Sequence, residues 1–306
     1  MRLTTQVAEH TARPSSIPYP EAARIDEILF PSDLTPASDR AFEHAAMLGE
    51  RLGARVTLYH VLPAPPDGSG VEPRREALRR ARRDAFDHLE RSTKDRALTS
   101  EIMIEQEVSV HRGLLRALVA RKPDLTVMAT HGREWMAQLF TGSVAETALN
   151  AARRPVLLVR EPDHGVALPY RRILVPTDMT PASGRAFPMA AMLARAFNAE
   201  VIALHVAATP RGDAAFGTSW VSYEVESRLP SERALSEFLG EEFAGVEIRP
   251  HVLMGSAWDR ILEVAKVQRT DLIVMSTHGR DSMSDWVMGS HAERVVQQAP
   301  CPVLVV

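Results

Sequence analysis

A strand-like stretch that ends in a glycine loop occurs twice in this sequence. The first copy has the sequence VMATHG at residues 127–132 and reaches a Gly-Ser pair at 142–143 after nine further residues. The second has the sequence VMSTHG at 274–279 and reaches a Gly-Ser pair at 289–290, again after nine residues. Each copy begins with branched apolar residues, which is typical of a buried strand. This repeat indicates two copies of one fold rather than a solenoid of short units.

The repeat extends through most of the chain. Residues 28–33 recur at 173–178, an offset of 145, and Pro155 recurs as Pro302 at an offset of 147. A chain of 306 residues is also long enough for two domains of about 150 residues each. We therefore predict a flexible N-terminal extension at 1–24, a first domain at 25–160, a linker at 161–170 and a second domain at 171–306.

Within each half, strand patterns alternate with helical ones. This alternation predicts a parallel sheet with helices on both faces and right-handed crossovers. The predicted fold class is α/β, with two tandem doubly wound domains. In the first half the expected strands are 26–31, 55–61, 101–108, 124–129 and 155–159, and the expected helices are 36–52, 72–97, 112–121 and one from 143.

The composition limits the classes of protein. Hydrophobic residues make up 45% of the chain, charged residues 25%, and the net charge is −3, so nothing draws the whole chain to nucleic acid or anionic membranes. No apolar run approaches the roughly 20 residues that span a bilayer. The single cysteine, Cys301, fits a reducing compartment. We therefore expect a cytoplasmic protein with no nucleic-acid or membrane partner.

The repeated stretch has the chemistry of a phosphate site. A strand end, a glycine loop and a helix N-terminus supply free backbone N–H donors and the positive end of a helix dipole. Gly142 and Gly289 would let a phosphate approach the backbone, and Ser143 and Ser290 are suited to cap the helix. An ordinary strand-to-helix connection is the alternative for a single copy, but two copies at equal spacing favour a ligand.

Asp33 and Asp178 follow the first strand of each half. Side chains at the carboxyl ends of parallel strands face the ligand crevice, where a carboxylate can accept a hydrogen bond from an adenine amino group or a ribose hydroxyl. The alternative is that each Asp caps the turn that follows it. The recurrence of this residue in both halves favours the ligand.

Histidines recur at the other strand ends. His131 and His278 precede the loop glycine, where a loop-shaping hydrogen bond is expected rather than a metal ligand, because no second ligand lies at metal spacing. His60 and His205 end the second strand of each half, and a hydrogen-bonded histidine near the core is expected there. No metal site is predicted.

Three segments leave alternatives open. The run at 74–96 is basic but contains acidic residues throughout, which favours a solvated helix face over a nucleic-acid patch. The aromatic stretch at 209–230 is either a lid or a self-packed loop. Gly113 is either the counterpart of Gly255 in a shortened third helix, or it is not the counterpart at all. The apolar side of the basic helix is predicted to consist of Ala77, Leu78, Ala81, Ala85, Phe86 and Leu89.

Taken together, these motifs resemble the universal stress protein family in both halves. The family pattern G-x2-G-x9-G-[S/T] is matched except at its first glycine, which is Ala129 in one half and Ser276 in the other. The resemblance implies a five-stranded sheet of order 3-2-1-4-5 in each half, and last strands, beginning at Pro155 and Pro302, that pair the domains. It also implies adenine near the Asp and the second strand, with phosphates on the glycine loop.

The resemblance implies these nucleotide-binding residues: Pro31, Ser32, Asp33, Val61, Met128, Ala129, His131, Gly132, Arg133, Gly142, Ser143 and Val144, and Pro176, Thr177, Asp178, Val206, Met275, Ser276, His278, Gly279, Arg280, Gly289, Ser290 and His291.

The expected function is therefore that of a stress-response regulator that binds ATP, ADP or AMP, with or without Mg²⁺, and whose domains associate, including as a homodimer. No P-loop, dinucleotide fingerprint, G-x-S-x-G elbow or nucleophile–base pair is evident, so an enzyme is not expected. Two alternatives remain: a slow ATPase or phosphoryl-transfer protein, and an assembly module that binds no nucleotide.

Overall fold

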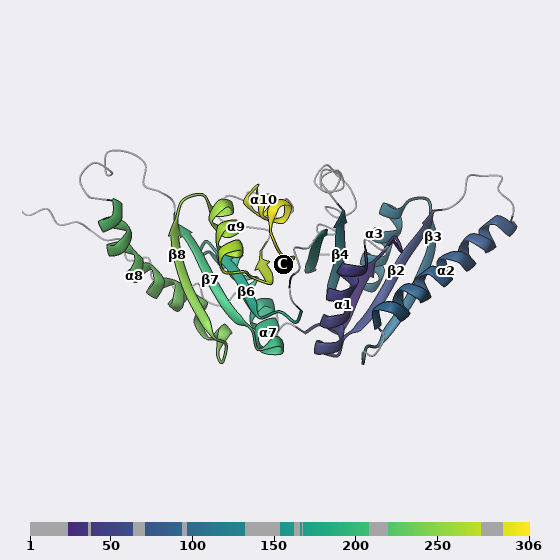
Figure 1. Ribbon diagram of the computed structural model, residues 1–306, viewed down its shortest axis with the longest axis horizontal. Helices are drawn as coiled ribbons and strands as arrows, with labels where there is room; N and C mark the ends of the chain where they lie inside the picture. The colour runs from purple at the N-terminus through teal and green to yellow at the C-terminus, as the bar shows by residue number, and fades with distance from the viewer. Residues whose placement is uncertain are drawn as a thin grey trace, which may run out of the picture.

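The computed structural model describes residues 24–35, 38–63, 71–93, 97–131, 154–161, 166, 168–207, 220–276 and 290–306. Within these ranges the strands form one ten-stranded sheet, which runs through both halves of the chain. In Figure 1 the halves lie side by side, with β3 and β8 toward opposite ends. The predicted N-terminal extension lies almost wholly outside the described residues.

The first half alternates strands and helices as predicted. Its elements are β1 (Glu27–Pro31), α1 (Asp39–Leu52), β2 (Arg55–Pro63), α2 (Val71–Thr93), β3 (Ser100–Glu107), α3 (Val110–Arg121), β4 (Leu125–His131) and β5 (Val156–Glu161).

The second half follows the same order. Its elements are β6 (Arg172–Thr177), α6 (Pro181–Gly184), α7 (Phe187–Phe197), β7 (Glu200–Ala207), α8 (Trp220–Leu239), the 3₁₀ helix η3 (Gly240–Phe243), β8 (Ile248–Met254), α9 (Ala257–Val267), β9 (Leu272–Met275), α10 (Ser290–Gln298) and β10 (Val303–Val305).

The strand order confirms the predicted fold class. The sheet runs β3-β2-β1-β4-β5-β10-β9-β6-β7-β8, so each half has the order 3-2-1-4-5. Neighbouring strands within a half are parallel. The two halves meet where β5 and β10 pair antiparallel, with Leu157 opposite Leu304. The expected pairing of the last strands is therefore confirmed within one chain.

Helices cover both faces of the sheet, so its strands are apolar on both sides. In β1, Ile28 and Phe30 belong to one core cluster, whereas Leu29, between them, belongs to the other. The first cluster includes residues of α1 and α7, and the second includes residues of α3 and α9. Near-continuous apolar runs are what a parallel sheet buried on both faces requires.

Polar contacts also join the halves. The hydroxyl of Tyr170 lies 2.7 Å from Nδ1 of His44 on α1. Arg160 donates from Nη1 to the backbone carbonyl of Gln297 at 2.6 Å. Tyr170 ends the predicted linker, yet its side chain is fully buried against the first half.

Two helix starts differ from the sequence-based expectation. The first helix was expected from residue 36 but begins at Asp39, because the chain first makes a turn in which Leu34 has a positive φ of 64°. The stretch at 209–230 was expected to be a lid or a loop, but Trp220 starts α8, so its second half is helical. Residues 208–219 lie outside the described residues.

The structure decides between the two alternatives for Gly113. Ser109 precedes α3 and Ser256 precedes α9, an offset of 147, which places Val108 at the position of Gly255. Gly113 lies inside α3, and its counterpart is Arg260. Gly113 is therefore not the partner of Gly255, and the third helix has not lost a turn: α3 has 12 residues and α9 has 11.

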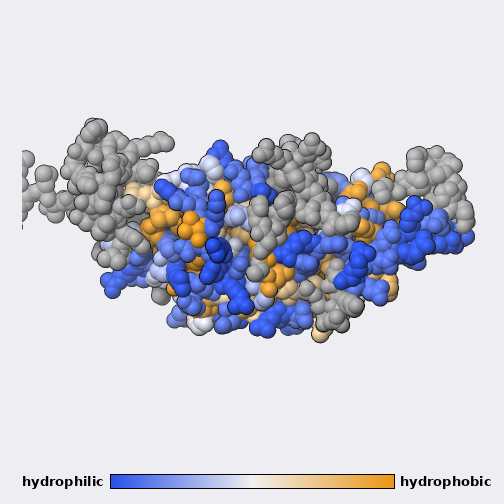
Figure 2. All heavy atoms as spheres, in the orientation of Figure 1, coloured by the Kyte–Doolittle hydropathy of each residue, from blue (hydrophilic) through white to orange (hydrophobic). Residues whose placement is uncertain are grey.

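The buried face of α2 also differs from the prediction. Ala81 and Ala85 are buried as expected, and His88, one helical turn further, is fully buried. Phe86 was expected on this face but is 59% exposed, because it lies about 100° around the helix from Ala85. Figure 2 shows hydrophilic side chains over the outer face of α2, in agreement with the predicted solvated face. Within the described ranges, none of the helices is long and apolar enough to cross a bilayer.

Candidate functional site

The candidate site lies where the direction of strand order reverses in each half. β1 pairs with β2 through to Pro31, but its pairing with β4 stops after Leu29 and Thr126. In the second half the pairing of β6 with β9 stops after Leu174 and Ile273. Beyond these positions the first and fourth strands of each half no longer pair, so their carboxyl ends separate. Open α/β sheets bind their ligands at this switch point.

A tight turn follows β1 at this point. The carboxylate of Asp33 accepts hydrogen bonds at Oδ1 from the backbone N–H of Thr35 at 3.0 Å, from its hydroxyl at 2.7 Å, and from the Ser38 hydroxyl at 2.8 Å. Ser32 is buried, and its Oγ accepts from the N–H of Leu34 at 3.0 Å. These bonds fix the orientation of the Asp33 carboxylate at the sheet edge.

The second half repeats the turn after β6. Asp178 accepts at Oδ1 from the N–H of Thr180 at 3.0 Å and from its hydroxyl at 2.6 Å. Ser183, the counterpart of Ser38, lies 2.7 Å from Thr177 Oγ1 and donates to the Thr180 carbonyl at 2.9 Å. The serine is therefore placed differently in the two halves, although the aspartate turn is the same.

In these contacts Asp33 and Asp178 each cap the turn that follows them, which was the alternative to ligand binding. They engage one oxygen, Oδ1, in each carboxylate. A capped aspartate at a sheet edge is also an oriented acceptor, so the ligand-binding role of both residues stays a prediction. The recurring Thr-Pro-Ala-Ser sequence at 35–38 and 180–183 was the signal for the threonine that holds the carboxylate in each half, and for Ser38 in the first half. Sequence reasoning had not assigned these residues.

The histidines at the end of the second strand are hydrogen-bonded as expected. His60 Nδ1 lies 2.9 Å from the carbonyl of Ser32, and His205 Nδ1 lies 3.0 Å from the carbonyl of Thr177. Each histidine thus ties its strand to the start of the aspartate turn. The prediction of a satisfied histidine near the core is confirmed for both.

The strand ends around the turn are apolar. Val61 and Met128 are buried in the first half, and Met275 in the second, whereas Val206 is partly exposed. Ala129, at the position of the first family glycine, is 9% exposed and belongs to the core cluster that includes α1. Ser276 at the equivalent position is 8% exposed. Pro31 is the last residue of β1, and Pro176 is the last but one of β6.

The predicted phosphate loops fall outside the described residues. Ser290 and His291 are described and start α10, so the predicted Ser290 lies at a helix N-terminus. His131 is the last residue of β4, and only its backbone is described. The predicted site residues that lie outside the described ranges are Gly132, Arg133, Gly142, Ser143, Val144, His278, Gly279, Arg280 and Gly289.

Tyr59 on β2 is a buried polar residue that sequence reasoning missed. Its hydroxyl lies 2.8 Å from the carbonyl of Gly113 and 3.1 Å from Oε2 of Glu105. Burial, and then the negative charge of Glu105, hold the pKa of Tyr59 well above its usual value. Its backbone carbonyl accepts from the N–H of Ser32 at 2.9 Å, so it also supports the aspartate turn.

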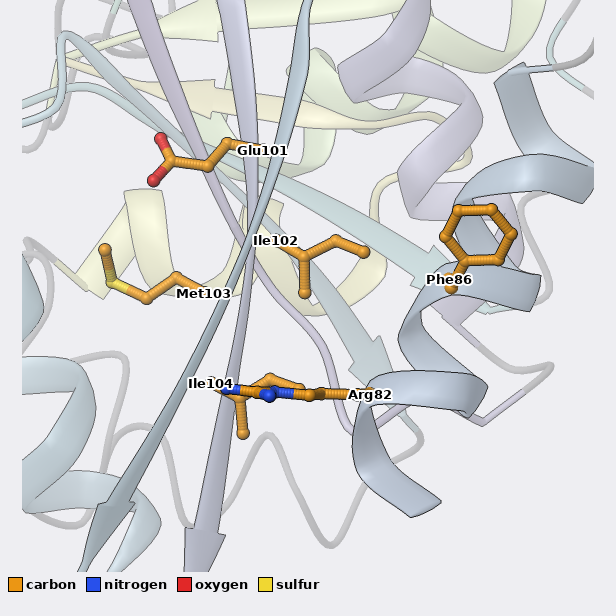
Figure 3. Close-up of a pocket in the computed structure, with 6 residues that line it drawn as sticks. All are labelled: Arg82, Phe86, Glu101, Ile102, Met103 and Ile104. Carbon is orange, nitrogen blue, oxygen red and sulfur yellow. The ribbon is translucent and has the colours of Figure 1, made fainter. Parts of the chain in front are cut away.

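Two cavities lined by described residues lie away from this edge. The groove in Figure 3 has a volume of about 590 Å³ and runs between α2 and the outer strand β3. Arg82 and Phe86 project from α2, and Ile102 and Ile104 lie on β3 opposite them. A second cavity of about 570 Å³ lies between the halves beside Phe197. Neither is lined by a predicted nucleotide-binding residue.

The fold and this duplicated edge define a tandem α/β protein, and comparisons with known proteins identify its family. The sequence model of the universal stress protein family matches residues 24–160 and 169–306. The chain belongs to the universal stress protein family, and the resemblance inferred from the motifs is confirmed.

Individual relatives agree with this assignment. A universal stress protein of Mycolicibacterium smegmatis is 29% identical over 291 residues, which cover 91% of this chain and 96% of the relative. A universal stress protein of Methanocaldococcus jannaschii is 36% identical over 140 residues, which cover 45% of this chain and 82% of the relative. The crystal structure of a universal stress protein from Archaeoglobus fulgidus superposes with a TM-score of 0.64 at 19% identity, covering 92% of this chain and 96% of that one.

Proposed function

We propose that each half of this chain binds an adenine nucleotide at the carboxyl edge of its sheet, and that the chain acts as a cytosolic regulator through that binding. One observation carries the proposal. In both halves an aspartate turn, held by the same threonine contacts, stands where the first and fourth strands stop pairing. An oriented carboxylate beside buried apolar strand ends offers a hydrogen-bond acceptor and an apolar wall, which suit an adenosine group.

In this proposal Asp33 and Asp178 accept from the adenine or the ribose, and Val61 and Val206 pack against the base. The glycine loops and the N-terminus of the last helix supply N–H donors to the phosphates. Mg²⁺ enters as a counter-ion of the nucleotide rather than through a protein site. Nothing in the described contacts favours the slow-ATPase alternative over binding alone.

Calorimetric titration of ATP, with and without Mg²⁺, into nucleotide-stripped protein tests the proposal. Two sites per chain are expected. Asp33→Ala and Asp178→Ala form a matched pair, and each should remove one site while leaving the other unchanged. If ATP, ADP and AMP all give no heat and no thermal stabilisation, the proposal is wrong.

A second function, assembly without nucleotide, is favoured by the first-glycine position. Ala129 is packed in a core cluster, so a methyl group occupies the position that the family pattern gives to glycine. The continuous sheet also gives the chain a built-in domain pairing. Analysis of denatured, freshly purified protein for bound ATP, ADP or AMP separates the two functions. Nucleotide at about one or more molecules per chain excludes pure assembly.

A further inference from the structure

An ionisable pair, of which the histidine is fully buried and the aspartate partly exposed, lies next to the first-half site. His88 on α2 is fully buried, and its Nδ1 lies 2.9 Å from Oδ1 of Asp39 at the start of α1. The two atoms are close, but their geometry is not that of a hydrogen bond, and Nε2 has no hydrogen-bond partner among the described residues. The His88 ring packs against Phe30 and Phe42, with centroids at 6.3 Å and 5.2 Å, and these two phenylalanines also contact each other.

Three charged groups of the described residues act on His88. Burial is the largest influence and lowers the pKa of His88 below its usual value. Asp39 opposes this effect most strongly, Asp33 opposes it from the end of β1, and Arg91 on α2 adds to it. His88 is therefore neutral at pH 7 and gains its charge only in acid.

A short path connects this pair to the candidate site. Asp39 directly follows Ser38, and the Ser38 hydroxyl donates to Asp33 Oδ1 at 2.8 Å. A shift of Asp39 toward or away from His88 must move the start of α1 and with it the serine that orients Asp33. The negative charge of Asp33 also acts on His88 and raises its pKa, though less than Asp39 does.

The second half lacks both charges at the equivalent positions. Phe187 corresponds to Phe42 at an offset of 145 and packs edge-on against Phe238 at 5.6 Å, as Phe42 packs against His88. A phenylalanine thus replaces the histidine. Gly184 stands at the position of Asp39, also at an offset of 145. These two positions are ionisable in the first half and carry no ionisable group in the second.

We propose that Asp39 and His88 are positioning residues for Asp33, and that they make the first-half site sensitive to acid while the second-half site is not. The nucleotide-binding consequence rests on the proposed function. The effect on the Asp33 turn does not, because it follows from the pair and the Ser38 contact alone.

The sign of the effect follows from the environment of His88. A histidine whose pKa is lowered by folding contributes stability above its unfolded pKa of about 6.5, and this contribution is lost as the pH falls through the folded pKa. Protonation places a desolvated cation against Phe30 and Phe42 and draws the carboxylates of Asp39 and Asp33 toward it. Asp39 and the start of α1 then shift toward α2, Ser38 shifts with them, and the Asp33 turn loses its fixed geometry.

The test compares the two halves at pH 7.5 and pH 5.5 by calorimetry. The Asp178→Ala variant isolates the first-half site, and Asp33→Ala isolates the second. The first-half affinity for the nucleotide should fall by about fivefold or more in acid, at the low end of typical site-to-site coupling. The second half is titrated with the same nucleotide, so protonation of the ligand itself is controlled for.

The chain provides its own matched control. The double variant Asp39→Gly with His88→Phe gives the first half the residues of the second, and it should remove the acid response. Asp39→Asn keeps the shape of the side chain and loses its charge, so it should move the response to lower pH. If Asp39 had only a structural role, this substitution would not change the pH at which the first-half affinity falls. Equal acid responses in the two halves, or an unchanged response in the double variant, would overturn the proposal.

Hydrogen exchange separates this proposal from the proposed function. The protection factors of the amides from Ser38 to His44, corrected for the intrinsic exchange rate at each pH, should be lower at pH 5.5 than at pH 7.5 in the wild-type chain. In the double variant they should not change. The His88 ring signals, assigned by their loss in His88→Phe, should titrate below pH 6.5. If no nucleotide binds at either pH, the proposed function fails and the exchange data still decide whether the pair positions the turn.

Discussion

The hydroxyl of Tyr170 lies 2.7 Å from Nδ1 of His44, and both side chains are fully buried. His44 belongs to α1 of the first half, whereas Tyr170 lies two residues before the first strand of the second. The Tyr170 ring also packs edge-on against Phe197 on α7, at 5.5 Å between centroids. The contact therefore fastens the two halves on one face of the sheet, and β5 and β10 join them within it.

Tyr170→Phe should lower the free energy of unfolding by about 1–3 kcal/mol, because it removes a buried partner of His44 while keeping the ring. Urea denaturation measures this cost. A double-mutant cycle with His44→Phe is the control, since the two losses should not add if the side chains act as a pair. Full additivity would mean that the contact does not contribute as a pair.

Gly113→Ala should destabilise the first half, although alanine favours a helix. A Cβ at this position would lie 2.7 Å from Cγ2 of Val61 and 3.2 Å from the Tyr59 hydroxyl. Val61 is buried and branched, so it cannot move aside freely, and the overpacking should cost about 1–2 kcal/mol net. Thermal unfolding measures the loss. Adding Val61→Ala should recover part of it; a double variant no better than the sum of the two single changes would contradict this account.

Tyr59 should resist ionisation in alkali. Its pKa is raised by burial and by Glu105, so it contributes stability that is present below pH 10, the usual tyrosine pKa, and is lost as the pH rises through the folded value. Ultraviolet titration of tyrosinate should show a late step among the four tyrosines. That step should vanish in Tyr59→Phe. A variant with the same titration curve as the wild type would assign the late step elsewhere.

Gly142→Val and Gly289→Val should each abolish nucleotide binding in their own half. The added side chain fills the space through which a phosphate reaches the backbone N–H groups. Calorimetry of each single variant should count one site rather than two, and the double variant none. Both positions lie outside the described residues, so far-ultraviolet circular dichroism serves as the folding control. Normal ATP binding in both single variants would refute the assignment of the loops.

The strand order could be predicted from the sequence because the relevant signals are local. Largely apolar runs such as 125–129 and 173–176 are buried on both faces, and parallel neighbours require crossovers of one hand. The same reasoning found the aspartates and the strand-end histidines. It also kept open the pairing of Gly113, which only the observed position of Ser109 could decide.

What the sequence did not reveal were polar residues placed in apolar surroundings. His88 continues the buried stripe of Ala81 and Ala85, but a histidine does not count as apolar in a periodicity argument. Tyr170 lies in a segment with linker composition, and its burial depends on α1, more than 100 residues earlier in the chain. The start of α8 at Trp220 was obscured by neighbouring glycine and serine residues. Each of these features depends on tertiary contacts.

The antiparallel pairing of β5 with β10 has a consequence for how such a chain can diverge. Because both strands belong to one polypeptide, they meet at a fixed local concentration of roughly millimolar, and dilution does not separate them. In a homodimer joined through the same strand pairing, both subunits come from one gene, so every substitution would appear in both copies. Here each half has a permanent partner and can change alone, as the exchange of Asp39 for Gly184 illustrates. The two halves of this single chain therefore correspond to the two different subunits of a heterodimer, joined covalently.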